Sequence, residues 1–127
     1  MNVRQLWAAY SGRQGSGCKI VVMPKLVIHA PLSKAQQQGK RSFAQTVATG
    51  VGDGYAINRR LRQQLTPGDG VVVLDKDTRQ RAEGRMTGLQ PNGWTGNGIQ
   101  RYDVLTRDLA IVTYQSEDLN RNGVAVI

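Results

Sequence analysis

Residues 65–74 constrain the fold of this 127-residue chain most, because they join a predicted helix to a predicted strand. The Thr-Pro-Gly-Asp sequence at 66–69 is typical of a tight turn, since Pro67 fixes φ and Gly68 accepts a positive φ. Pro67 also ends the preceding helix. Residues 71–74 form an uninterrupted apolar run, mostly valine, which predicts a strand buried on both faces.

The segments on either side extend this unit. Between residues 55 and 65, apolar side chains recur at i, i+4 and i+8, which predicts a helix with one apolar stripe. Residues 75–78 have the composition of a turn, and residues 79–87 predict a polar return strand. The predicted order is therefore helix, tight turn, buried strand and hairpin.

Weaker patterns predict several more short elements. An apolar face at i, i+3, i+4 and i+7 predicts a helix over residues 3–10. The predicted strands are residues 19–23 and 25–30, then 102–105, 110–114 and 124–127. The first two are alternatively one strand broken by Pro24, which indicates an edge or a bulge. We expect turns at 106–108 and 120–123, the second with an Asn-Gly hairpin signal, and glycine-rich loops at 50–54 and 88–98.

Residues 33–50 leave two interpretations open. Ser33 is a candidate N-cap for a helix that runs through Gln38, although Gly39 weakens that helix. The alternative is a basic excursion that becomes ordered only when a partner binds.

The length of the chain predicts one domain over residues 1–127, large enough to bury a hydrophobic core without disulfides. Fifteen glycines, clustered between apolar runs, indicate many short elements joined by turns. We predict an α+β domain with a mostly antiparallel, barrel-like sheet of five to seven strands. Two short helices, near residues 3–10 and 55–65, are expected to pack on it.

The compartment is predicted from what the sequence lacks. Cys18 is the one cysteine, so no internal disulfide forms and a reducing compartment fits. No apolar stretch approaches the ~20 residues that a membrane span needs. Arg4 and Arg13 interrupt any signal-peptide pattern. We therefore expect a soluble protein of the cytoplasm.

Basic residues are concentrated in the first half of the chain. Residues 1–65 hold ten Lys or Arg against one acid, Asp53, whereas residues 66–127 hold seven against eight. The N-terminal half is thus strongly basic and the β-rich second half is near neutral. Charge of one sign at this density favours a polyanionic partner, nucleic acid before membrane.

The candidate binding residues are cations and one aromatic. On the predicted helix, Arg59, Arg60 and Arg62 have no neighbouring acid, and a guanidinium matches a phosphate bidentately. Lys40 and Arg41 are expected to add phosphate contacts. Trp94 lies in a polar, glycine-rich stretch. It either anchors a loop to the core or forms a stacking platform for an unpaired or flipped base.

Catalytic, metal and cofactor signatures are weak. One histidine, His29, and one cysteine are too few for a metal site. Residues 11–17 form a glycine-rich basic loop but lack the Lys-Ser/Thr ending of a phosphate-binding P-loop. No paired carboxylates or nucleophile with a base stand at a hydrolase spacing. We expect no cofactor and no metal, and we favour a non-catalytic protein.

Residues 55–87 resemble the PUA-like superfamily, which includes PUA, ASCH and EVE domains. The resemblance consists of a helix, a Gly-Asp turn at 68–69, a buried strand and a hairpin with its return strand. It implies a barrel fold that binds RNA or DNA, with an aromatic pocket for a modified base in EVE-type members. The aromatic residues that could serve are Trp7, Tyr55, Trp94 and Tyr102.

Three function classes follow from the sequence. The favoured class is non-catalytic binding of nucleic acid, RNA or DNA, through the basic surface. The second is a protein-interaction or assembly module whose basic half docks on an acidic protein. The third is a small nuclease or hydrolase.

Overall fold

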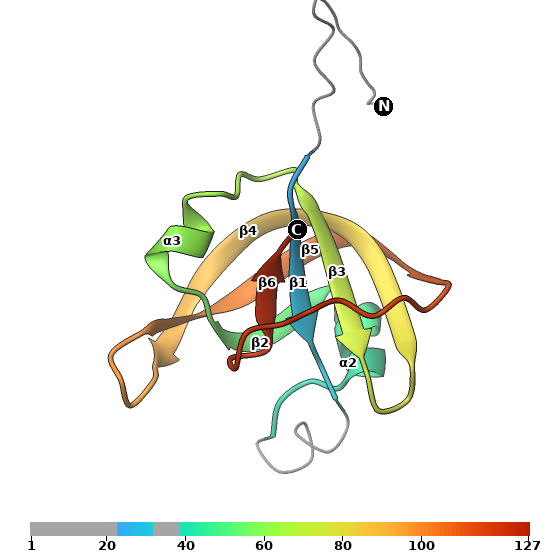
Figure 1. The fold of residues 1–127 in the computed structure, drawn as a ribbon, viewed down its shortest axis with the longest axis horizontal. Coiled ribbons are helices and arrows are strands. Elements are labelled where there is room, and N and C mark those ends of the chain that lie inside the picture. The colour runs from blue at the N-terminus through green and yellow to red at the C-terminus, as the bar shows by residue number, and fades with distance from the viewer. Residues whose placement is uncertain (1–22, 32–38) are drawn as a thin grey trace, which may run out of the picture.

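The computed structural model describes residues 23–31 and 39–127, which form one six-stranded sheet curled into a half-barrel (Figure 1). This arrangement confirms the predicted α+β class with a barrel-like, mostly antiparallel sheet. The elements are β1 (Lys25–His29), α2 (Phe43–Thr49), β2 (Val51–Ala56), α3 (Arg59–Arg62), β3 (Gly70–Asp75), β4 (Gln80–Trp94), β5 (Gln100–Val112) and β6 (Val124–Val126). The predicted helix at 3–10, Cys18 and nearly all of the predicted strand at 19–23 lie outside the described residues.

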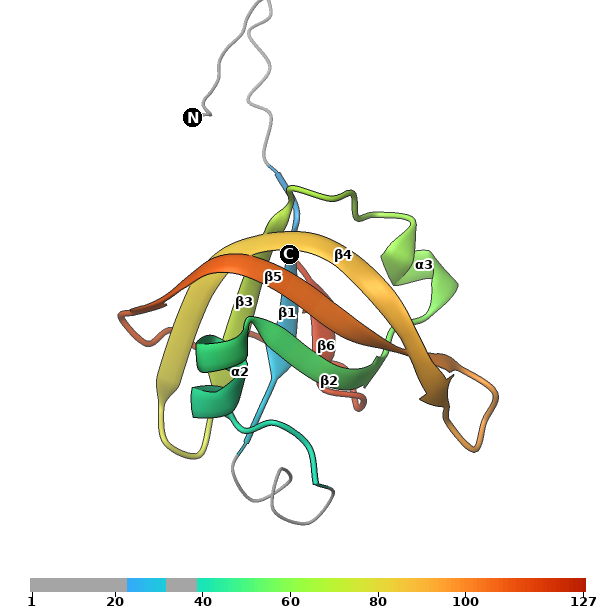
Figure 2. The ribbon, with the colours of Figure 1, turned by 180° about the vertical axis from the view of Figure 1, so that it is seen from behind.

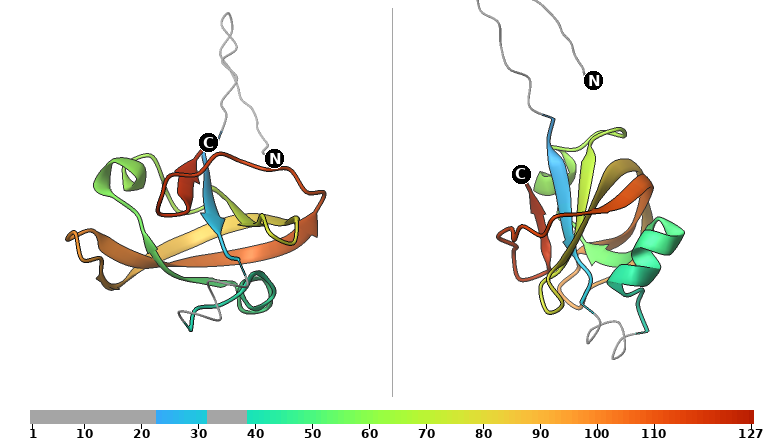
Figure 3. Two further views of the ribbon diagram at one scale, coloured as in Figure 1. Left: turned by 60° about the horizontal axis from the view of Figure 1, so that its bottom comes forward. Right: turned by 90° about the vertical axis from the view of Figure 1, so that its right-hand side faces the viewer.

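The strand order across the sheet is β2-β5-β4-β3-β1-β6. Among the strands of the described residues, β1 and β3 pair in parallel, and the other four neighbouring pairs are antiparallel. The long strands β4 and β5 arch over the molecule and bend the sheet round, as the views in Figures 2 and 3 show. β2 and β6 are therefore the two edges of the half-barrel.

β3 is buried on both faces, as its unbroken apolar run predicts. Val71 and Val73 join the main core on the concave face. Val72 and Leu74 join a second cluster on the convex face, which Tyr114, Leu119 and Ala125 cover. The segment between β5 and β6 crosses in front of β3 and β1 in Figure 1 and provides part of that cover.

The turn before β3 has the predicted conformation. Gly68 has a φ of +99°, a value that a side chain with a branched Cβ adopts only under strain. The Asp69 side chain is buried, and its carboxylate accepts a hydrogen bond from the backbone N–H of Thr66 at 2.8 Å. The Met86 N–H donates to the Asp69 carbonyl, so the turn also docks on β4.

Residues 50–54 are not the predicted loop, because β2 runs through them. A Cβ on Gly52 would lie 2.8 Å from Cδ1 of Ile28, so glycine here permits β2 to pack closely on β1. Gly54 has a φ of +60° where the pairing with β5 shifts register. These glycines mark a close approach and a bulge, which a count of turn residues does not separate from a loop.

The predicted helix over residues 55–65 is shorter than its apolar stripe indicates. Tyr55 belongs to β2, and α3 begins only after Asn58, whose side chain accepts a hydrogen bond from the Leu61 N–H. The apolar residues predicted to form the stripe do reach the core: Ile57 is fully buried, and Leu61 and Leu65 pack against it. Their burial therefore does not require a continuous helix.

α2 is a helix that the sequence prediction missed. Its N-cap is Ser42, which forms a capping box with Gln45, and Gly50 ends it in the left-handed conformation. Phe43 and Thr46 face the core. The helix predicted between Ser33 and Gln38 lies outside the described residues.

β4 replaces residues 88–94 of the predicted loop at 88–98, whereas residues 95–98 form the loop between β4 and β5. β5 replaces the predicted turn at 106–108. Pro91 is tolerated because β3 pairs only with residues 80–85, so this part of β4 has no neighbour on its other side. Asp108 has a φ of +59° in a bulge opposite Gly84. A Cβ on Gly84 would lie 2.6 Å from the Arg107 carbonyl oxygen, so the bulge requires glycine there.

β1 and β6, the first and last described strands along the chain, pair with each other. The predicted turn at 120–123 is confirmed by Gly123, which has a φ of +74°, but β6 pairs with β1 and forms no hairpin with the residues before the turn. Pro24 marks neither an edge nor a bulge. It precedes β1, and its carbonyl accepts a hydrogen bond from the Gly70 N–H at 3.2 Å.

A buried arginine fastens the segment that follows β5. Arg81 is 4% exposed, and it donates to the carboxylates of Glu117 at 2.8 Å and Glu83 at 3.0 Å. Arg81 also donates to the Gln115 carbonyl at 2.8 Å. Burial alone would raise the pKa of Glu83, but hydrogen bonds from Lys25 and Arg81 outweigh it and hold that pKa below its ordinary value. The ion pairs of this region form one network of four residues: Lys25, Arg81, Glu83 and Glu117.

Candidate functional site

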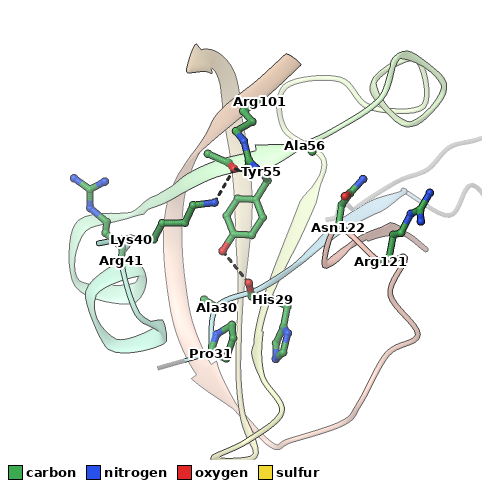
Figure 4. Close-up of a pocket in the computed structure, with 11 residues that line it drawn as sticks. His29, Ala30, Pro31, Lys40, Arg41, Tyr55, Ala56, Arg101, Arg121 and Asn122 are labelled. Atoms are coloured by element: carbon green, nitrogen blue, oxygen red, sulfur yellow. Dashed lines mark hydrogen bonds between the residues drawn. The ribbon is translucent and has the colours of Figure 1, made fainter. Parts of the chain in front are cut away.

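The curled sheet leaves a seam between β2 at one edge and the β1–β6 pair at the other. One side chain bridges this seam. The Tyr55 hydroxyl on β2 donates a hydrogen bond to the His29 carbonyl at the end of β1, at 3.0 Å (Figure 4). Burial, with a smaller contribution from the charge of Asp53, raises the pKa of Tyr55 well above its ordinary value. The hydroxyl therefore keeps its proton and remains a donor.

Beside this bridge lies a hollow of about 130 Å³, called the seam hollow below. Four cationic side chains line it: Lys40, Arg41, Arg101 and Arg121. The other described residues of its wall are His29, Ala30, Pro31, Gly54, Tyr55, Ala56 and Asn122. The cations come from three separate parts of the chain, so the seam brings together charge that is scattered in the sequence.

Two of the four cations converge on one backbone carbonyl. Lys40 Nζ and a guanidinium nitrogen of Arg101 donate to the Gly54 oxygen, at 3.1 and 2.9 Å. The Gly54 N–H in turn donates to Asp103 at 2.9 Å, so the bulge in β2 is fixed from both sides. Lys40 Nζ also lies 5.9 Å from the centre of the Tyr55 ring.

The other two cations differ in how far they are neutralised. Arg41 forms an ion pair with Asp53, and its backbone N–H donates to the same carboxylate at 2.9 Å. Arg121 is exposed in the turn before β6. Among the ion pairs of residues 23–31 and 39–127, none includes Arg101 or Arg121.

The three candidate arginines on α3 are not equivalent. Arg59 and Arg60 are exposed and form no ion pair within the described part of the chain. Arg62 is half-buried: it donates to the Ile57 carbonyl at 2.7 Å and lies 5.0 Å above the Tyr102 ring. Arg62 therefore has a structural task, and none of the three lines the seam hollow.

Of the two alternatives predicted for Trp94, the anchor of a loop to the core is wrong. It ends β4 opposite Gln100, near the tip of the β4–β5 hairpin, and is 65% exposed. β3 no longer accompanies β4 at this point, so no neighbouring strand covers the indole on that side. Among the other aromatic candidates, Tyr55 is buried, Tyr102 packs under Arg62, and Trp7 lies outside the described residues.

Three consecutive residues of β5 connect these features. Gln100 pairs with Trp94, Arg101 reaches the Gly54 carbonyl in the seam hollow, and Tyr102 supports Arg62 of α3. Figures 1 and 2 both show α3 and the tip of the hairpin on the same side of the molecule. The candidates Arg41 and Lys40 join this side through the hollow that they share with Arg101.

Arg101 and Arg121 are missing from the candidates that the sequence suggested. Both lie in the near-neutral half of the chain, where a balance of charges over 62 residues conceals them. The available signal was local. Asn-Arg-Asn-Gly at 120–123 has no acid within it, and Arg101 follows a glycine-rich stretch that contains the exposed tryptophan.

His29 has a structural contact in place of a metal. Its Nε2 accepts a hydrogen bond from the Lys76 N–H at 3.2 Å, which ties β1 to the turn after β3. Within the described ranges, no three His, Cys, Asp or Glu side chains are grouped to hold a metal ion.

Comparison with known proteins does not assign this chain to a family. No protein-family model, no curated protein and no solved structure matches it. In the part of the chain that the structure describes, no helix has the length and apolar character needed to cross a membrane.

Proposed function

We propose that this chain is a non-catalytic nucleic-acid-binding domain of the cytoplasm. The observation that carries the proposal is the closeness of three features, which involve the consecutive residues 100–102 of β5. An exposed indole, an arginine of the seam hollow and the support for an arginine-rich helix follow one another there. One strand of nucleic acid needs both kinds of group, cations for its phosphates and an aromatic surface for a base.

The charge environment supports the same proposal. Arg59 and Arg60 are exposed without an acidic partner in the described residues, so their guanidinium groups are available to phosphates. Trp94 is 65% exposed, so its indole is accessible for stacking on a base. Stacking on Trp94 requires an unpaired or flipped base, and the resemblance to EVE-type PUA-like domains leads us to propose a modified base as the alternative.

The test is binding to fluorescently labelled oligonucleotides, measured by anisotropy over a series of salt concentrations. Single- and double-stranded DNA and RNA of random sequence are compared. Each phosphate contact that is lost makes the salt slope shallower by about 0.7 for single strands and about 0.9 for duplex DNA. The double variant Arg59→Gln, Arg60→Gln is expected to weaken binding to all sequences alike and to flatten the slope by about two contacts.

The matched control is Arg85→Gln, Arg107→Gln, which removes the same charge from exposed positions on β4 and β5. Arg62 is left unchanged because its contacts with Ile57 and Tyr102 would confuse binding with folding. The proposal fails if both double variants lose affinity equally, or if the intact protein binds no oligonucleotide at low salt. Binding to acidic proteins but to no oligonucleotide would instead identify an assembly module.

A further inference from the structure

The seam hollow is large enough for an anionic group. Its volume of about 130 Å³ is several times the roughly 10–15 Å³ that a cavity needs to hold one water molecule. A phosphate group therefore fits such a space, and the rest of a larger molecule bound there can extend out of the hollow.

The hollow retains N–H donors that the fold does not use. Arg101 uses one guanidinium N–H for the Gly54 carbonyl, and its remaining donors have no partner among the described residues. Arg121 makes no ion pair with a described residue, and it lies next to Asn122, whose side chain also borders the space. Acidic groups nearby are already engaged: Asp53 by Arg41, and Asp103 by the Gly54 N–H and by Asn92.

The arrangement of the cations favours one kind of phosphate. Lys40 and Arg41 precede α2, Arg101 comes from β5 and Arg121 comes from the turn before β6, so cationic residues from three parts of the chain border the space. A phosphodiester within a strand carries a substituent on two sides. A phosphomonoester offers three free oxygens and is joined to the rest of its molecule by one bond. This suits a hollow that several cationic residues border.

We propose that the seam hollow binds a phosphomonoester group, such as the phosphate at the end of a nucleic-acid strand. Arg101 and Arg121 are its principal ligands. This site deepens the proposed function and rests on it only where the phosphomonoester is a strand end. A small phosphorylated molecule offers the same chemistry, and the experiment separates the two sources.

The experiment is calorimetric titration of the intact protein with single-stranded oligonucleotides of one sequence. These carry a 5′-phosphate, a 3′-phosphate or hydroxyl groups at both ends, and adenosine monophosphate is titrated separately. The oligonucleotide with either the 5′- or the 3′-phosphate is expected to bind about tenfold more tightly than the one with hydroxyl groups at both ends. The reason is that charge-assisted hydrogen bonds are stronger than those between neutral groups. The variant Arg101→Gln, Arg121→Gln is expected to abolish that preference.

The matched control is again Arg85→Gln, Arg107→Gln. Arg85 donates one hydrogen bond to the Gly68 carbonyl, as Arg101 does to Gly54, and Arg107 is exposed like Arg121. The control should keep the preference for a phosphorylated end. If the hollow variant melts at a lower temperature, Arg121→Gln alone provides the test, because Arg121 is exposed and makes no ion pair with a described residue.

Each outcome has one meaning. Adenosine monophosphate that binds as tightly as the phosphorylated strand, and only with Arg101 and Arg121 intact, supports the site and identifies a small ligand as its source. Oligonucleotides that bind regardless of their ends overturn the site and leave the proposed function standing. A preference for phosphorylated ends that survives in the hollow variant also overturns the site.

Discussion

Arg81 on β4 and Arg101 on β5 lie on neighbouring strands of one sheet, yet their surroundings are opposite. Arg81 is buried, and its guanidinium contacts the carboxylates of Glu83 and Glu117. Arg101 lines an open hollow, and its guanidinium donates a hydrogen bond to the Gly54 carbonyl. The position of the acidic residues, more than that of the cations, therefore determines whether an arginine stabilises the fold or remains available to a ligand.

The acids of the second half of the chain illustrate this point. Glu83 and Glu117 are both engaged by Arg81, which fixes the segment after β5 against the sheet. At the seam, Asp53 neutralises Arg41, and no described carboxylate forms an ion pair with Arg101 or Arg121, so these two arginines remain available. The near-zero charge of residues 66–127 is thus an average over two very different regions.

The largest effect is expected from Arg81→Met, which keeps the volume but removes the cation. Glu117 would then lose its partner in a partly buried site and Glu83 would keep only Lys25, so we expect a loss of about 3–5 kcal/mol in the free energy of unfolding. Denaturant unfolding followed by circular dichroism measures it. Arg101→Gln is the counterpart and should cost less than about 1 kcal/mol. Equal losses would remove the distinction between the two regions.

Trp94→Ala should act on binding and leave stability unchanged. Stacking on an aromatic ring is worth about 1–3 kcal/mol per base, so single-strand affinity should fall about 5- to 150-fold at an unaltered melting temperature. Ile111→Ala is a suitable control, because Ile111 is also on the hairpin strands and is 64% exposed. A lower melting temperature with full affinity would show that Trp94 belongs to the stabilising part of the molecule.

Gly68→Val should destabilise the turn that feeds β3. The positive φ of Gly68 strains a β-branched residue, so the expected loss is more than ~1 kcal/mol of unfolding free energy. Gly88→Val is the matched change on β4, at a glycine without a positive φ and with nothing within 4 Å of an added Cβ. Thermal unfolding distinguishes them, and similar melting temperatures would contradict a role for the turn.

The smallest effect is expected from acid. Burial opposes ionisation of Glu83, but its hydrogen bonds to Lys25 and Arg81 prevail, so its pKa is lower in the folded protein than in the unfolded chain. The resulting stabilisation is present above about pH 4.3, the unfolded value, and is lost as the pH falls through the folded value. Urea midpoints measured from pH 6 to pH 3 should therefore fall less in Glu83→Gln than in the parent chain. Identical slopes would exclude Glu83 as a contributor.

The sequence predicted the elements that local chemistry determines. Gly68, Asp69 and the valine run of β3 carry their own turn and strand signals, and the structure confirms them. Local signals failed where tertiary contacts decide. Gly52 resembles a loop residue, but it is glycine because Ile28 packs against it from a strand 24 positions earlier.

The candidate site was predicted in part for the same reason. Lys40 and Arg41 were selected from the charge of the first half, and the structure places both at the seam hollow. Arg101 and Arg121 come from distant strands and turns, so only the curled sheet brings them to the same place. The exposure of Trp94 depends on where β3 ends beside β4, which no pattern around the tryptophan itself reveals.

The position of β1 between β3 and β6 has a consequence for how the chain folds. Leu26 pairs with Val71 on one side and with Val126, about 100 positions later, on the other. At a synthesis rate of about 5–20 residues per second, β1 waits roughly 5–20 s on the ribosome before its second neighbour exists. Its centre, Leu26 to Ile28, is completely buried in the finished fold, so during that delay an apolar strand remains open to other chains. We expect slow folding and a need for protection by chaperones during synthesis.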